Sequence, residues 1–117
     1  MPFMKIDLFK LVFFTTFLVI EYLALTPQHI EVLEGLWDKQ NHFSAFFVLY
    51  VLLSFAYQNF QVLKKIGILL LIGLQIEMTQ YFIPGRFFST LDILADGVGI
   101  AVGVVVYKYV SKIKKLL

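Results

Sequence analysis

The sequence predicts an all-α integral membrane protein, built as an antiparallel bundle of four transmembrane helices. Its composition is the first indication: 60% of the 117 residues are hydrophobic and 15% are charged, whereas soluble domains carry about 25% charged residues. Four segments also approach the roughly 20 apolar residues that cross a bilayer. Four such spans leave only short tails and connections, which predicts a single domain over residues 1–117. Because there is no cysteine, disulfides, a CxxC zinc site and a thiol nucleophile are excluded.

The four predicted spans cover residues 8–25, 43–63, 66–83 and 91–110. Glu21 lies near the end of the first span. A secretory signal is a weaker interpretation of that span, because no small-x-small cleavage site follows it cleanly. The second span contains no charged residue. The last two contain polar side chains inside their apolar stretches: Gln75, Glu77 and Gln80 in the third, and Asp92, Asp96 and Lys108 in the fourth.

The connections between spans contain two further patterns. Ile30, Leu33 and Trp37 fall at i, i+3 and i+7 and form one apolar face. This spacing predicts a short interfacial helix in the first outer loop. Ser89, three residues before Asp92, predicts a capping box at the start of the fourth span.

The charges are sorted by position along the chain. Eight of the ten basic residues belong to the two tails and to a tight turn between the second and third spans: Lys5, Lys10, Lys64, Lys65, Lys108, Lys112, Lys114 and Lys115. Cytoplasmic loops are enriched in Lys and Arg, so both termini are predicted to be cytoplasmic. Seven of the eight acids fall on the opposite, outer side: Glu21, Glu31, Glu34, Asp38, Glu77, Asp92 and Asp96. The net charge of +2 is too small to indicate nucleic-acid binding.

Helical phase places several of these polar residues on common faces. At about 100° per residue, each of the last two spans has one polar or small-residue stripe. These stripes are Gly73, Glu77, Gln80, Tyr81 and Pro84 in the third, and Asp92, Ala95, Asp96, Gly99 and Gly103 in the fourth. A GxxxG spacing allows a neighbouring backbone to approach closely, within the bundle or in an oligomer. We therefore expect one polar cluster near the outer surface, formed by all four helices.

These residues also form a recognisable pattern. The motifs are Asp38-Lys39-x-x-His42-Phe43, Glu77-x-x-Gln80, and Pro84-x-Arg86-x-x-Ser89-x-x-Asp92-x-x-Ala95. In this order they resemble the VanZ-like family, and Asp96 departs from a pattern in which Asn is expected. The resemblance implies a small multi-pass protein of the bacterial cytoplasmic membrane. It also implies a role in the cell envelope, because the family's namesake is associated with teicoplanin-type glycopeptide resistance.

Three hypotheses for function follow. In the first, the protein binds an outer-leaflet or cell-wall-precursor-type ligand, or a glycopeptide. The ligand-binding residues would be Asp38, Lys39, His42, Glu77, Gln80, Arg86, Asp92 and Asp96. In the second, it is an intramembrane enzyme acting on a lipid-linked substrate, with His42, Glu77 and Asp92 as acid–base candidates. Those residues with Asp96 would alternatively ligate a divalent ion, although the sequence assigns neither a metal nor a cofactor. In the third, the protein is a small proton-coupled exporter that works as a dimer, with Glu21 as its membrane-embedded acid.

Overall fold

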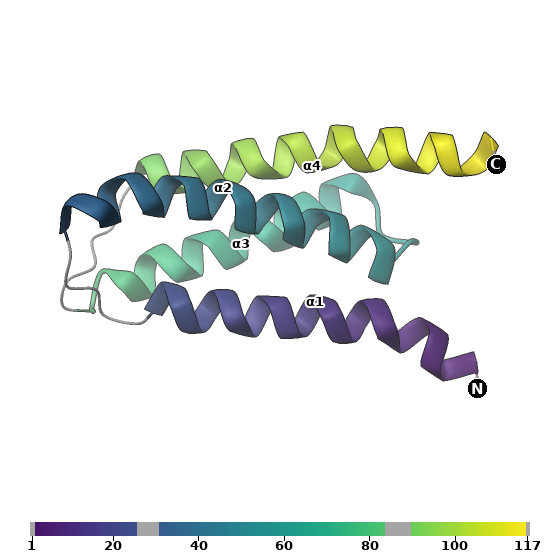
Figure 1. The fold of residues 1–117 in the computed structure, drawn as a ribbon, viewed down its shortest axis with the longest axis horizontal. Coiled ribbons are helices and arrows are strands. Elements are labelled where there is room, and N and C mark those ends of the chain that lie inside the picture. The colour runs from purple at the N-terminus through teal and green to yellow at the C-terminus, as the bar shows by residue number, and fades with distance from the viewer. Residues whose placement is uncertain (1, 26–30, 84–89, 117) are drawn as a thin grey trace.

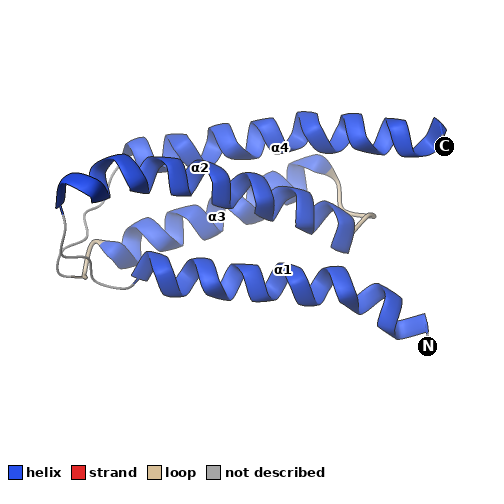
Figure 2. Ribbon diagram, viewed as in Figure 1, coloured by secondary structure: helices blue, strands red, loops and turns tan. Residues whose placement is uncertain are grey.

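The computed structural model describes residues 2–25, 31–83 and 90–116, with side chains described over 8–25, 41–83 and 90–113. The chain forms four helices, α1 (Pro2–Leu25), α2 (Glu31–Ala56), α3 (Val62–Gln80) and α4 (Thr90–Leu116). No strand occurs within these described ranges (Figure 2). The all-α, four-helix prediction is confirmed.

Successive helices run in alternating directions along the long axis, and both termini lie at the same end (Figure 1). The turn between α2 and α3 lies at that end as well (Figure 1). The basic residues of the two terminal segments and those near this turn therefore lie at one end of the molecule. α4 packs most extensively along α2, and α1 contacts α2 and α3.

The predicted boundaries of the second and third spans differ from the structure. α2 ends at Ala56, and α3 begins at Val62, so the span predicted over 43–63 is wrong at its end. The polar residues between the two helices form a tight turn, in which the Phe60 amide donates to the Tyr57 carbonyl at 3.1 Å. Stacking of the Tyr57 and Phe60 rings, 4.7 Å apart, holds this turn together. The third helix likewise ends at Gln80, three residues earlier than predicted.

The start of α2 also differs from expectation. The sequence predicted a separate short helix around Ile30, Leu33 and Trp37, but α2 runs without a break from Glu31 to Ala56. Its first turns are therefore a continuation of the longer helix. Their place in a membrane interface stays a prediction, as does the Ser89 cap, because Ser89 lies outside the described residues.

The close approach of α2 and α4 depends on two glycines. A Cβ atom at Gly99 would overlap the backbone carbonyl oxygen of Phe43, and one at Gly103 would come within 3.0 Å of the Tyr50 Cβ. The prediction that this GxxxG spacing accommodates a neighbouring helix is confirmed. α2 of the same chain lies against both glycines, and an oligomer formed through them stays a prediction.

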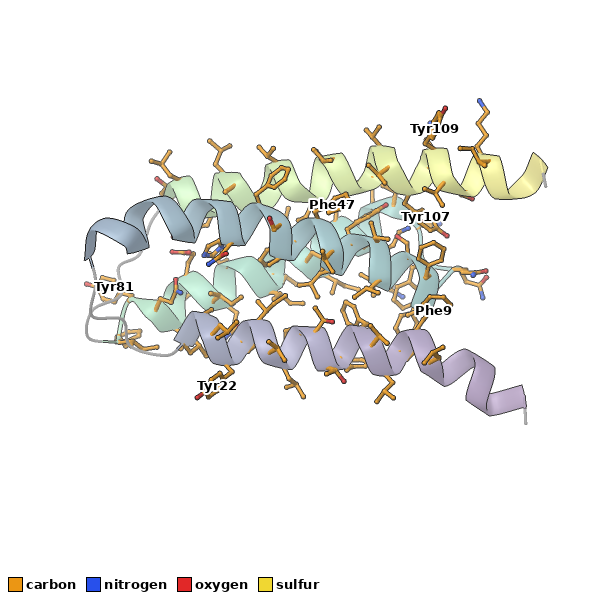
Figure 3. All side chains as sticks on the ribbon, in the orientation of Figure 1. Phe9, Tyr22, Phe47, Tyr81, Tyr107 and Tyr109 are labelled. Carbon is orange, nitrogen blue, oxygen red and sulfur yellow. The ribbon has the colours of Figure 1, made fainter. Side chains whose placement is uncertain are left out.

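The hydrophobic core lies between the helices and includes Phe13, Phe46, Leu49, Tyr50, Leu53, Leu69, Ile76 and Ile100. A ladder of aromatic rings connects three helices near the terminal end. Phe9 stacks on Phe55 at 5.3 Å, and Phe55 meets Tyr107 edge-on at 5.2 Å. Figure 3 shows Phe9 and Tyr107 on this side of the bundle.

Much apolar surface remains uncovered. Leu8–Leu25 and Thr90–Ile113 are long and apolar enough to cross a membrane, and only 6% of the first segment is buried. At 1.5 Å per residue, 18 helical residues reach about 27 Å, close to the thickness of a hydrocarbon core. Tyr22, Tyr81 and Tyr109 project outward near the two ends of the bundle (Figure 3). Aromatic residues at these positions are typical of helices that lie in a bilayer.

Candidate functional site

A histidine–aspartate pair joins α2 to α4. The Nδ1 atom of His42 donates to the Asp96 carboxylate, with 2.6 Å between Nδ1 and Oδ1. The two residues are 54 positions apart in sequence, and the close contact of Phe43 with Gly99 brings their turns together. A hydrogen bond to a carboxylate fixes the imidazole tautomer and leaves the Nε2 lone pair on the far side of the ring.

The Nε2 atom faces two more carboxylates from two different helices. It lies 3.5 Å from Glu77 Oε1 on α3 and 3.8 Å from Asp92 Oδ2 on α4. Both separations exceed the roughly 2.7–3.2 Å of an N–H···O hydrogen bond. One donor atom each from His42, Glu77 and Asp92 lies within 4.8 Å of the others. We refer to His42, Glu77, Asp92 and Asp96 as the His–carboxylate cluster.

The cluster is shielded from solvent. Glu77 and Asp96 are fully buried, and Asp92 and His42 retain only 5% and 8% of their exposure. With a neutral imidazole, three ionised carboxylates give a net charge of −3, and even protonation of His42 would leave −2. Buried charge without compensation is costly, so the cluster requires a proton, a cation or a cationic ligand group to be stable.

Gly73 on α3 makes room for this arrangement. A Cβ atom there would lie 2.5 Å from Asp96 Oδ2, an oxygen that is buried and has no hydrogen-bond partner among the described residues. The same Cβ would lie 3.4 Å from the Phe46 ring. The Asp96 carboxylate therefore leaves no room for a side chain at position 73. Glycine at this position lets that carboxylate lie between α3 and α4.

Other predicted site residues lie apart from the cluster. The Gln80 side chain donates to the Ala24 carbonyl at 2.7 Å and connects α3 to α1. Glu21 accepts from Gln75 at 3.5 Å, on an exposed part of α3. The expected contribution of all four helices is therefore wrong for the described cluster, which comes from α2, α3 and α4. Tyr81, predicted on the Glu77 face, is 67% exposed.

Three predicted ligand contacts are not described by the structure. Asp38 and Lys39 belong to α2, but their side chains lie outside the described residues, and Arg86 lies outside them altogether. Their roles stay predictions.

A buried lysine is a feature that the sequence did not reveal. Lys65 was predicted to lie in the tight turn between the second and third spans, but it is 4% exposed, and its Nζ donates to Ser54 Oγ at 2.8 Å. The ammonium also lies 4.7 Å from the Tyr50 ring centroid and 4.8 Å from that of Tyr107. Since α3 begins at Val62, Lys65 is already one turn into the helix. Lys65 lies at helical spacing from the buried residues Leu69, Gly73 and Ile76. This spacing is the sequence feature that could have predicted its burial.

Exposed apolar helices around a buried cluster of ionisable side chains define a small multi-helix membrane protein. The VanZ/LLP1 family profile matches residues 2–112, nearly the whole chain, and the protein belongs to this family. The resemblance inferred from the sequence motifs is thereby confirmed. Comparison with curated proteins and with solved structures found no match.

Proposed function

We propose that this VanZ/LLP1 protein spans the bacterial cytoplasmic membrane four times, with both termini in the cytoplasm. The bases of the tails and of the α2–α3 turn lie at one end of the molecule (Figure 1), as the positive-inside rule requires of a cytoplasmic face. The His–carboxylate cluster then lies in the outer half of the membrane. α2 supplies a shorter apolar helix, Asn41–Ala56, to this arrangement.

The cluster binds the polar part of an outer-leaflet or cell-wall-precursor-type ligand. One observation carries this proposal: a buried His42–Asp96 pair adjoins two further acids in a membrane protein. Ionisable groups at membrane depth are expensive and by default indicate function. VanZ itself is linked to teicoplanin resistance, and a ligand on the outer surface would be where glycopeptides act.

The surplus negative charge specifies part of the ligand chemistry. An amine, a hydroxyl donor or a cation-bound phosphate would complement three carboxylates. Lys39 and Arg86 are proposed to contact an anionic headgroup beside the cluster, since guanidinium groups suit bidentate phosphate binding.

A second function, acid–base catalysis on a lipid-linked substrate, is favoured by the same histidine. A carboxylate that holds Nδ1 orients the imidazole and stabilises the imidazolium form, so that Nε2 serves as the base. A proton-coupled exporter has less support, because Glu21 contacts Gln75 and does not join the cluster.

The proposal is tested by expression in a glycopeptide-susceptible host. Wild type is expected to lower teicoplanin susceptibility, and His42→Ala and Asp92→Asn to abolish that effect at equal membrane levels. Glu21→Gln, which changes an acid outside the cluster, is the matched control and should behave as wild type. Equal susceptibility of wild type and both cluster variants would refute the proposal. A change in the lipid-linked precursor pool that depends on His42 would identify catalysis instead of binding alone.

A further inference from the structure

We infer that His42, Glu77 and Asp92 form a binding site for one divalent first-row metal ion, oriented by Asp96. The inference adds a metal to the site of the proposed function. It rests on the geometry of the cluster and can be tested on purified protein without any glycopeptide.

The distances between the donor atoms support this assignment. A metal bound at about 2.0–2.2 Å to nitrogen and oxygen ligands holds neighbouring donors roughly 3.0–3.5 Å apart. His42 Nε2 lies 3.5 Å from Glu77 Oε1 and 3.8 Å from Asp92 Oδ2. These separations are too long for direct hydrogen bonds. All three donor atoms lie within 4.8 Å of one another, so coordination of one ion requires the two carboxylate oxygens to move together by up to roughly 1 Å.

Asp96 supplies the outer contact that metal-binding histidines usually have. A ligating imidazole normally donates its other ring N–H to a carboxylate or carbonyl, which fixes the ring and increases its basicity. The 2.6 Å contact of His42 Nδ1 with Asp96 Oδ1 has this arrangement. It directs Nε2 toward Glu77 and Asp92, so the imidazole is already oriented as a ligand. Asp96 would act on the ion through His42, so it is a positioning residue.

Charge and ligand type indicate which ion would bind. A divalent cation beside a neutral imidazole reduces the charge of three carboxylates from −3 to −1. One imidazole and two carboxylates suit Zn²⁺ or Mn²⁺ better than Ca²⁺ or Mg²⁺, which prefer sites made of oxygen alone. Three protein ligands leave at least one coordination position open. A phosphate or carbonyl oxygen of an outer-leaflet ligand would occupy that position.

The site also lies where three helices of the bundle meet. Its ligands come from α2, α3 and α4, and Asp92 and His42 are the two that retain slight exposure. A bound ion would therefore join three helices and stabilise the folded bundle in proportion to its concentration and affinity.

The experiment uses the full chain in detergent, stripped with a chelator and titrated with ZnCl₂ or MnCl₂ by calorimetry. We expect saturable binding of one ion per chain and a rise in thermal midpoint that a chelator reverses. Glu77→Gln and Asp92→Asn should each weaken binding at least tenfold. Asp96→Asn should weaken it by about 10–100-fold through the orientation of His42. Glu21→Gln is the matched carboxylate control and should bind as wild type.

The results separate this inference from the proposed function. If folded wild type shows no saturable binding of either ion, or Glu77→Gln binds as tightly as Glu21→Gln, the metal site is refuted. Loss of the teicoplanin effect in His42→Ala without any metal binding would retain the proposed function and reject the metal. If the protein binds metal but all cluster variants keep the wild-type teicoplanin phenotype, the metal site is retained and the proposed function is rejected. Helical circular dichroism at equal intensity shows that each variant is folded.

Discussion

Gly99→Ala offers a direct test of how α2 and α4 pack. The new methyl group would overlap the Phe43 carbonyl oxygen and lie 3.2 Å from the Phe47 amide nitrogen. Both atoms belong to backbone, so no side-chain rotation can relieve the overlap. The two helices would have to separate by roughly 1 Å to restore ordinary contact. Overpacking of this kind costs about 1–3 kcal/mol.

Gly97→Ala is the matched control for this substitution. Gly97 lies on the same helix, and a Cβ there meets nothing within 4 Å. Alanine in place of glycine inside a helix is favourable by about 0.5–1 kcal/mol, so Gly97→Ala should stabilise the protein slightly. Both variants gain this helix preference, so the difference between them should equal the overpacking cost of about 1–3 kcal/mol.

Reversible unfolding in mixed micelles, followed by helical circular dichroism, measures this difference. A separation of about 1 Å would also extend the 2.6 Å His42–Asp96 contact beyond hydrogen-bond range. Gly99→Ala should accordingly lose site function as well as stability. If Gly99→Ala is as stable as Gly97→Ala, the close packing of α2 on α4 is refuted.

Three further predictions follow from other parts of the molecule. Gly103→Ala should destabilise less than Gly99→Ala, because its nearest neighbours are side-chain atoms of Tyr50 at 3.0–3.2 Å; equal losses by the same unfolding assay would contradict this. Ser54→Ala should cost about 1.5–3 kcal/mol, since it leaves the buried Lys65 ammonium without its hydrogen bond. Lys65→Met in the Ser54→Ala background should recover most of this loss, and no recovery would refute the explanation. In this cysteine-free chain, Phe82→Cys should react with an impermeant maleimide added to intact cells and Asn59→Cys should not; the opposite pattern would invert the proposed topology.

The sequence predicted much of the site because helical periodicity is a local property. Asp92, Asp96 and Gly99 fall on one face of any regular helix, and the structure places that face against α2. Glu77 and Gly73 were likewise placed together on the third span, and both are buried. The polar faces could thus be predicted before the helices were assembled.

Contacts between helices could not be predicted in the same way. The His42–Asp96 pair depends on the axial offset between α2 and α4, which no periodicity specifies. Lys65 illustrates a different limit, because its burial follows from where α2 ends. The sequence placed the turn too late along the chain, and Lys65 was therefore assigned to the turn and not to the helix. An error of a few residues in a helix boundary was sufficient to conceal a buried charge.

The proposed function makes the His–carboxylate cluster the working site of the protein. Teicoplanin susceptibility of a sensitive host expressing His42→Ala, compared with wild type and Glu21→Gln at equal membrane levels, tests it most directly. We expect His42→Ala to return the host to the susceptibility of cells without the protein, and Glu21→Gln to retain the wild-type effect. If His42→Ala retains the full effect, the cluster is not the working site.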